Sequence, residues 1–339
     1  MIGLGISQSI SMLGIMQLGM VQFAEIIDYM ASVERILEYT QLEKERPQLT
    51  AAGKFSVLFI LFSVIIPLQD ERPSASWPSK GAITFRNLVL RYVENQAPVL
   101  RGLNLEIFPS EKIGIVGRTG AGKSSLVAAL FRLAPIEGEI LIDGVDTKTL
   151  ILKDLREKLS IIPQEPVLFP ASMRFNLDPF NEFNDEKLWN VLEEVELKNE
   201  IPDLDFMVID GGSNFSLGQR QLICLARAIL RNKKILILDE ATANVDPKTD
   251  QLIQKTIRRK FGHCTVLTIA HRLHTIMDSD RVLVMDSGNV VEFDHPYILL
   301  QNYTGYFSRM LMRAGPEVAH HMRNIAQEAY ESRFITTHL

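Results

Sequence analysis

The chain has 339 residues, of which 46% are hydrophobic, so it can form one large domain with an appendage or two domains of ordinary size. The formal net charge of −5 gives no general basic surface, and we therefore expect no nucleic-acid partner. The two cysteines, Cys224 and Cys264, lie far apart and form no CxxC pair, which favours buried thiols in a reducing compartment over a disulfide or a metal pair.

The first 24 residues contain no Asp, Glu, Lys or Arg. As a helix they would be about 36 Å long, which exceeds the roughly 30 Å of a bilayer's hydrocarbon core. Gly3, Ser7 and Ser11 recur every four residues, a stripe that suits close helix packing inside a membrane bundle. We predict one long transmembrane helix, the last of a larger bundle, with a buried soluble helix as the alternative. Its helical spacing continues past Glu25, so residues 1–40 form the helix and its cytoplasmic extension.

Residues 41–80 are a linker by composition, because they contain several prolines and a cluster of serines. One atypical apolar segment, 55–66, lies within it and is too short to span a bilayer comfortably. Residues 81–312 form a compact domain, and a polar tail follows over 313–339. Within the domain, strands are predicted over 83–92, 99–108, 112–116, 138–144, 160–164, 234–238, 265–270, 282–286 and 290–293. Helices are predicted over 155–159, 185–199, 217–230 and 250–261. This alternation predicts an α/β core with a mainly parallel sheet.

The stretch 112–125 has the pattern of an apolar strand, a glycine loop and the first turn of a helix. Gly117-x-x-x-x-Gly122-Lys123-Ser124 fits the Walker A pattern. Glycines let backbone N–H groups approach phosphate oxygens, and the helix adds its positive dipole end. Lys123 can reach the β- and γ-phosphates, and Ser124 can ligate Mg²⁺. The predicted phosphate-binding residues are Gly117, Arg118, Thr119, Gly120, Ala121, Gly122, Lys123, Ser124 and Ser125. A glycine-rich turn without a ligand is the alternative.

The second half of the site is the sequence Ile235-Leu-Ile-Leu-Asp239-Glu240. An apolar strand ends here in two carboxylates, at the edge where α/β sheets bind ligands. Asp239 is expected to hold Mg²⁺, largely through water, and Glu240 to take a proton from the attacking water. By itself such a run favours a strand that enters a polar turn, but downstream of a Walker A loop it indicates a nucleotide site.

Further motifs resemble those of ATP-binding-cassette (ABC) proteins. Asn214-Phe-Ser-Leu-Gly-Gln-Arg-Gln-Leu222 is similar to the family's signature sequence, with Ser216, Gly218 and Gln219 in its key positions. Gln164 matches the Q-loop glutamine, and Ala243-Asn-Val-Asp246 the D-loop. His271 matches the switch histidine that contacts the γ-phosphate, and Tyr92 the aromatic residue that stacks on adenine.

The segment from Gly114 to Leu300 looks like the second nucleotide-binding domain of the C subfamily, the multidrug-resistance-associated proteins. Ile161-Ile-Pro-Gln-Glu-Pro-Val-Leu-Phe169 and Asn176-Leu-Asp-Pro-Phe180 are similar to that group. Residues 1–40 resemble the family's last transmembrane helix. The fold class implied is a P-loop NTPase cassette with a parallel-sheet core, an antiparallel β subdomain and a helical subdomain.

The resemblance implies ATP and Mg²⁺ as ligands, with Gln164 joining Ser124 and Asp239 at the metal. It also implies Glu240, His271 and Gln164 as catalytic residues. ATP would lie between two cassettes, each completed by its partner's signature. The expected partners are the first cassette and transmembrane bundle of the same transporter, in a lipid bilayer that is the plasma membrane, with the ATP-binding domain in the cytoplasm. The implied function is ATP-driven efflux of amphipathic organic anions or drugs, by what looks like a C-terminal fragment of an exporter.

Three alternatives remain open from the sequence: a nucleotide-sensing regulatory cassette, a soluble ABC ATPase, and a truncated product without transport activity. The presence of Glu240 and His271 argues against a purely sensing site. The uncharged first 24 residues and the acidic composition argue against a soluble ATPase of translation or DNA repair. The chain ends Thr336-Thr337-His338-Leu339, which fits a C-terminal ligand of a PDZ domain, with an unstructured end as the alternative.

Overall fold

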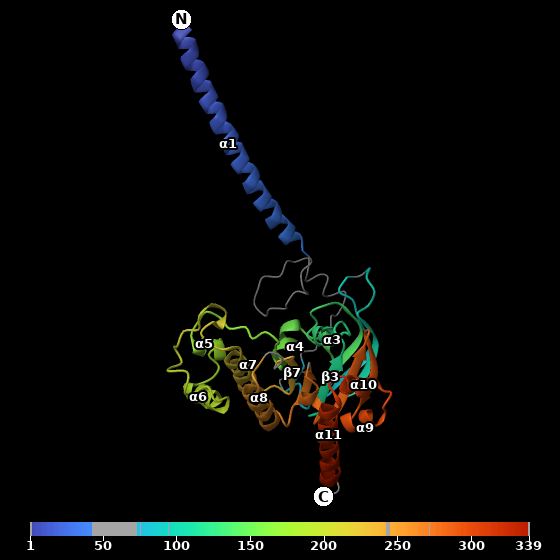
Figure 1. Cartoon of the computed structure of the whole chain (residues 1–339). Coiled ribbons are helices and arrows are strands. Elements are labelled where there is room, and N and C mark those ends of the chain that lie inside the picture. The colour runs from blue at the N-terminus through green and yellow to red at the C-terminus, as the bar shows by residue number, and fades with distance from the viewer. Residues whose placement is uncertain are drawn as a thin grey trace. The chain divides into compact units, whose positions relative to one another are not determined.

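A computed structural model describes residues 2–42, 73–74, 76–93, 95–241, 245–270 and 272–337. The chain forms two compact units, residues 1–53 and residues 54–339, and each is described by itself. The predicted apolar segment 55–66 lies outside the described residues. Figure 1 shows the elements of both units.

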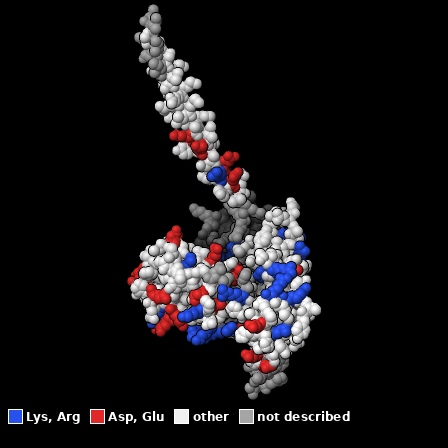
Figure 2. Space-filling model, viewed as in Figure 1, with Lys and Arg blue, Asp and Glu red and all other residues white. Residues whose placement is uncertain are grey.

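The first unit contains a single described helix, α1 (Ile2–Gln41), which confirms the predicted helix and its continuation past Glu25. Figure 2 shows charged residues on α1 only toward the end that leads into the rest of the chain. Among the described residues, however, no helix is both long and apolar enough to cross a membrane. The predicted transmembrane span is therefore not confirmed, since glycine, serine and glutamine interrupt the apolar residues of this helix.

The centre of the second unit is a six-stranded sheet with the strand order β10-β9-β3-β8-β7-β6. Its strands are β3 (Lys112–Gly117), β6 (Leu159–Ile162), β7 (Ile235–Asp239), β8 (Thr265–Ile269), β9 (Arg281–Asp286) and β10 (Asn289–Asp294). All neighbours are parallel except β10, which pairs antiparallel with β9. The first four residues of β7 are buried, as expected for a parallel strand covered on both faces. The predicted parallel core is confirmed.

A second, four-stranded antiparallel sheet has the order β2-β1-β4-β5. Its strands are β1 (Ile83–Leu90), β2 (Leu100–Ile107), β4 (Ile136–Ile142) and β5 (Val145–Asp146). Apolar side chains of β1 and β2 share one core with β3, α3 (Lys123–Leu130) and α4 (Leu152–Lys158). The antiparallel sheet therefore packs against the strand and the helix that flank the Walker A loop, and it confirms the predicted β subdomain.

A helical subdomain is built from α5 (Met173–Leu177), α6 (Asp185–Glu194) and α7 (Leu217–Arg231), which share an apolar core with α8 (Pro247–Lys260). Figure 1 shows α5 and α6 on the side of α7 that faces away from β3. The helix predicted over 185–199 is shorter than expected. It ends at Glu194, with Val195 as its C-cap, because Glu196 adopts a positive φ of 58°, which a right-handed helix cannot continue.

Three helices follow β10: α9 (Pro296–Gln301), α10 (Tyr306–Met312) and α11 (Pro316–Thr337). The segment predicted as a polar tail is mostly α11, which buries Ala319, Met322 and Ala326 against Phe307 and Leu311. The unstructured end given as the alternative to the PDZ motif concerns the last residues, of which His338 and Leu339 lie outside the described residues. The helix extends the cassette, because its buried residues belong to the same apolar cluster as β9.

Candidate nucleotide-binding site

The loop between β3 and α3 is shaped by glycines that no other residue could replace without distortion. A Cβ on Gly117 would lie 2.3 Å from the carbonyl oxygen of Met285, so the loop passes directly against β9. Gly122 caps the N-terminus of α3 with φ of 101°, a left-handed conformation that favours glycine. The loop therefore ends with the first N–H groups of α3 unpaired by any side-chain cap, which is the geometry of an anion site.

The Lys123 ammonium lies over this loop. Its Nζ donates hydrogen bonds to the carbonyl oxygens of Gly117 at 3.0 Å and Arg118 at 3.3 Å. These bonds hold the ammonium within the loop, so a phosphate bound by the loop's N–H groups would meet a positive charge already in position.

An open cleft of about 800 Å³ faces the loop. It brings Lys123 and Ser124 together with Gln164, from the loop after β6, and Glu240, which follows β7. The described residues that line it are Val99, Gly117, Arg118, Thr119, Gly120, Gly122, Lys123, Ser124, Ser125, Gln164, Glu240, Ala270, Leu273, Met310 and Arg313. The structure thus gathers residues that are far apart in the sequence at the carboxyl ends of the parallel strands, where α/β sheets bind ligands.

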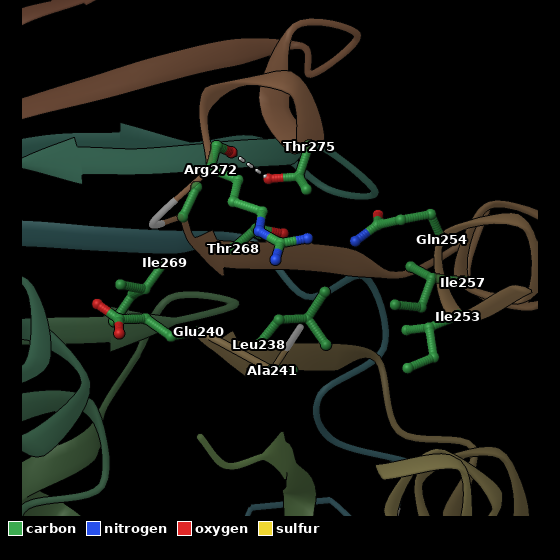
Figure 3. Close-up of a pocket in the computed structure, with 11 residues that line it drawn as sticks. Leu238, Glu240, Ala241, Ile253, Gln254, Ile257, Thr268, Ile269, Arg272 and Thr275 are labelled. Atoms are coloured by element: carbon green, nitrogen blue, oxygen red, sulfur yellow. Dashed lines mark hydrogen bonds between the residues drawn. The ribbon is translucent and has the colours of Figure 1, made fainter. Parts of the chain in front are cut away.

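Two carboxylates, Asp239 and Glu240, lie at the end of β7, and Glu240 lines the cleft. Burial raises the pKa of Asp239 above its ordinary value, and repulsion by Glu240 raises it further, while the charge of Lys123 lowers it. Glu240 adopts a positive φ of 48°, and its N–H donates to the carbonyl oxygen of Ile269 at 3.1 Å. In Figure 3 its carboxylate points away from Ile253 and Ile257 of α8. The turn after β7 therefore directs Glu240 out of the apolar core, and Glu240 lines the cleft.

The backbone at Gln164 is anchored by a side chain of α7. The buried amide of Gln221 donates to the carbonyl oxygens of Pro163 at 3.1 Å and Gln164 at 3.0 Å. The Gln164 side chain is itself exposed, so the backbone is anchored while the side chain is available to the cleft. The anchor also joins this loop to the helix that begins at the predicted signature.

Tyr92 lies beside the first turn of α3. Its hydroxyl donates to the Oγ of Ser125 at 3.1 Å, while 54% of the residue remains exposed. An aromatic ring fixed at one edge and open on its surface is suited to stack on a planar base.

The predicted signature residues do not line this cleft. Ser216 is the exposed N-cap of α7 and forms a capping box with Gln219, whose side-chain oxygen accepts from the Ser216 N–H at 2.7 Å. Gly218 is buried, and a Cβ there would lie 3.1 Å from Cγ2 of Thr249. Ser216 is therefore an exposed residue at a helix N-terminus that does not line the cleft at the chain's own phosphate loop.

Two predicted elements fall on positions that the structure does not describe. His271 lies outside the described residues, although Ala270 and Leu273 on either side of it line the cleft. Residues 242–244 of the predicted D-loop also lie outside, whereas Asp246 is the N-cap of α8.

The residues present fit a magnesium ion that is shared with phosphate. Within the described part of the chain, no group of three or more His, Cys, Asp and Glu residues is placed to hold a metal. Mg²⁺ in nucleotide sites uses one or two carboxylates together with substrate phosphates and water. Ser124, Gln164 and Asp239 supply one hydroxyl, one amide and one carboxylate, which is the donor set that such a shared ion needs.

Several residues of the cleft carry no recognisable signal in the sequence. Val99, Leu273, Met310 and Arg313 belong to no recognised motif, and Met310 and Arg313 come from α10 and its C-terminal cap. Only the packing of α10 near the sheet brings these two to the phosphate loop. Local patterns could not have identified them.

Comparisons with known proteins agree with this geometry. Residues 100–243 match the family model described as "ABC transporter". The chain is 52% identical over 336 residues to the human protein "ATP-binding cassette sub-family C member 4", covering 98% of this chain and 24% of that protein. It is 50% identical to the "Probable multidrug resistance-associated protein lethal(2)03659" of Drosophila melanogaster, covering 98% and 23%. The sequence motifs also predict a likeness to multidrug-resistance-associated protein 4 in particular, and the first of these relatives is a sub-family C member 4 protein.

A solved structure is similar as well. "Structure of a bacterial Atm1-family ABC exporter with ATP bound" superposes with a TM-score of 0.65 at 33% identity, covering 70% of this chain and 42% of that chain. The chain spans about a quarter of the length of the curated relatives it matches, at 24% of the human protein.

Proposed function

We propose that this chain, which carries an ABC transporter domain with the α/β fold of an ABC cassette, binds and hydrolyses ATP to drive export across a membrane. The observation that carries the proposal is the cleft that joins Lys123, Ser124, Gln164 and Glu240. Its support from comparison is the match of residues 100–243 to the ABC transporter family and the likeness to an exporter.

The chemistry proposed for the cleft is transfer of the γ-phosphoryl group to water. The Lys123 ammonium and the N–H groups of the loop would bind the phosphates, and Tyr92 would stack on the adenine. Ser124, Gln164 and Asp239 would hold Mg²⁺, which when bound neutralises charge on the phosphate oxygens. Glu240 would accept a proton from the attacking water as its oxygen bonds to the γ-phosphorus and the bond to ADP breaks. His271 would contact the γ-phosphate.

The proposed partners are a first cassette and the transmembrane bundle of the same transporter. Ser216, Gly218 and Gln219 do not line the chain's own cleft, which supports their use at the nucleotide of an opposite cassette. Residues 81–312 are proposed to be the second cassette of the parent protein, in the cytoplasm at the plasma membrane. The cargo proposed is amphipathic organic anions or drugs, because the relatives include a probable multidrug resistance-associated protein.

The experiment measures ATP binding and hydrolysis by the chain, alone and mixed with the first cassette of its parent transporter. Wild type is expected to turn over ATP in the mixture. Glu240→Gln is expected to bind ATP within twofold of wild type and to lose about 100-fold or more in turnover, because proton transfer contributes about 10²–10⁴-fold.

Lys123→Ala is the control, and it should lose binding and turnover together. Hydrolysis that persists in Glu240→Gln would remove this residue from the role of base. Tight binding without turnover in the wild-type mixture would favour the nucleotide-sensing cassette, and absence of both would favour a transport-incompetent product.

We also propose that the C-terminus is a ligand for a PDZ domain, from the sequence of its last four residues alone. Leu339 lies outside the described residues. A pulldown with PDZ domains should lose its signal when Leu339 is deleted, and binding that survives the deletion would rule the motif out.

A further inference from the structure

The first turn of α8 carries a buried carboxylate that the proposed chemistry does not use. The side chain of Asp250 is 7% exposed, and its Oδ2 lies 3.6 Å from Nη1 of Arg272 and 3.4 Å from Nε2 of His274. A buried carboxylate is costly unless it is paired. Asp250 of α8 is therefore paired with Arg272 and His274, and these contacts connect α8 to the segment that follows β8.

The segment after β8 contacts both the nucleotide cleft and Asp250. Ala270 and Leu273 line the cleft, and Arg272 between them faces α8. The turn is closed by Thr275, whose hydroxyl donates to the carbonyl oxygen of Arg272 at 2.7 Å. In Figure 3 the Arg272 guanidinium extends over Ala241 and Leu238, toward the α8 side chains and away from the Glu240 carboxylate. A shift of Arg272 along its ion pair would therefore move residues that line the cleft.

The same first turn of α8 also packs against the signature. A Cβ on Gly218 would lie 3.1 Å from Cγ2 of Thr249 and 3.4 Å from Oδ2 of Asp246, the N-cap of α8. Gly218 follows Ser216, which is exposed. The turn that carries Asp250 thus lies between the chain's own cleft and the surface proposed to serve an opposite cassette.

The ion pair between Asp250 and Arg272 can become shorter. Oδ1 of Asp250 is buried and has no hydrogen-bond partner among the described residues. A separation of 3.6 Å is longer than a hydrogen bond. Arg272 can therefore change from one long contact to a paired contact with both oxygens, which is the preferred geometry of an arginine and a carboxylate.

We propose that Asp250 is a positioning residue that links the segment after β8 to the first turn of α8, which packs against the signature. Through this link, closure at one nucleotide site would change the geometry of the other. The inference rests on the proposed function, because it assumes that the cleft and the signature serve two nucleotide sites. Asp250 touches neither nucleotide nor metal in this scheme and acts through Arg272.

The chain offers a matched control. Arg258 of α8 and Asp278 join the same two segments through an ion pair of 2.8 Å, but the pair involves the last turn of α8 and is more exposed. Asp278→Asn removes the same charge from the same kind of contact as Asp250→Asn. A purely structural role for links between these segments predicts similar effects from both variants.

The test uses the full chain mixed with the first cassette of its parent transporter. In Asp250→Asn, kcat is expected to fall about tenfold, the scale of coupling through contacts that touch no ligand. KM and ATP affinity should stay within twofold. Asp278→Asn should keep kcat within twofold. Arg272→Gln should match Asp250→Asn, and the double variant should be no slower than either, because both disrupt the same Asp250–Arg272 ion pair through which Asp250 is proposed to act.

Unchanged kcat in Asp250→Asn, or an equal fall in Asp278→Asn, would overturn the proposal. If Asp250→Asn does not fold, Arg272→Gln carries the same comparison, since this partner is 38% exposed in its side chain. If wild type binds ATP without hydrolysing it, the proposed function fails, and hydrogen exchange then decides the inference. ATP should slow exchange over 265–276 in wild type and Asp278→Asn but not in Asp250→Asn, and equal slowing in all three would refute it.

Discussion

Two aspartates of the cassette, Asp239 and Asp143, have pKa shifts of opposite sign. Their contributions to the free energy of unfolding therefore change with pH in opposite directions. For Asp239, burial raises the pKa first, and the neighbouring Glu240 raises it further. For Asp143, burial alone would raise the pKa, but hydrogen bonds from the backbone N–H groups of Lys80, Gly81 and Ala82 lower it overall. A raised carboxyl pKa opposes folding once the group ionises, whereas a lowered one favours folding in the ionised form.

The Asp239→Asn substitution is expected to raise the melting temperature at pH 7.5. Because the folded pKa is raised, the stability linked to this carboxyl is present at low pH and lost as pH rises through the folded pKa. The gain from Asn should therefore vanish below the unfolded pKa. In the same variant, affinity for Mg²⁺ in the presence of ATP should fall about tenfold or more, by analogy with losses at metal sites.

Asp143→Asn is the control, because the pKa shift of Asp143 has the opposite sign to that of Asp239. Its folded pKa is lowered, so the stability it contributes is present above the unfolded pKa and lost as pH falls through the folded pKa. Thermal denaturation across pH 3 to 8 checks both. A melting temperature of Asp239→Asn at or below that of wild type at pH 7.5 would contradict the account of the site's electrostatics.

At the scale of the elements, α7 begins with a residue that is given two roles. Ser216 caps the helix, since its Oγ accepts from the Gln219 N–H at 3.2 Å, and it is also proposed to face the opposite cassette's nucleotide. Replacing a serine N-cap by alanine costs about 1 kcal/mol, and replacing it by glycine costs a few tenths. The two substitutions therefore separate the cap from the hydroxyl.

Ser216→Ala is expected to lower the free energy of unfolding by about 1 kcal/mol, and Ser216→Gly by much less. Both should reduce ATP turnover in the mixture with the first cassette to a similar extent, because both remove the hydroxyl. Urea denaturation and the ATPase assay measure the two effects. Ser172→Ala, at the N-cap of α5, is the matched control that should lose stability without losing turnover. Turnover that follows stability across all three variants would show that Ser216 is only a cap.

Several elements were predictable from the sequence because their signals are local. The apolar run of β7 and the glycines of the phosphate loop impose strand and loop conformations by their own chemistry. The shortened α6 was not predictable, because its end depends on a left-handed backbone at Glu196 rather than on the apolar pattern. The docking of α11 was not predictable either, because among its described side chains the buried residues Ala319, Met322 and Ala326 are scattered through a polar helix.

At the scale of the whole molecule, the sequence predicted the cleft's motifs but not its full lining. Motifs identified Lys123, Gln164 and Glu240, because their roles depend on residue type and order along the chain. Arg313 and the pairing of Asp250 with Arg272 come from contacts between segments that are distant in sequence. The spacing of apolar residues along the sequence does not predict such contacts. The membrane span was predicted from the absence of charged residues over 1–24, but among the described residues no helix is long and apolar enough to cross a membrane.

The central claim is that nucleotide held at the phosphate loop is enclosed only when a second cassette brings its signature across. Sedimentation velocity of the Glu240→Gln chain, with and without ATP and Mg²⁺, tests it most directly. This variant should retain ATP, so any association that ATP drives is not reversed by hydrolysis.

We expect association of the Glu240→Gln chain with itself or with the first cassette only when ATP is present, and no such response after adding either Lys123→Ala or Gly218→Arg. ATP binding without any change in sedimentation would contradict the account, and so would association that is indifferent to both substitutions.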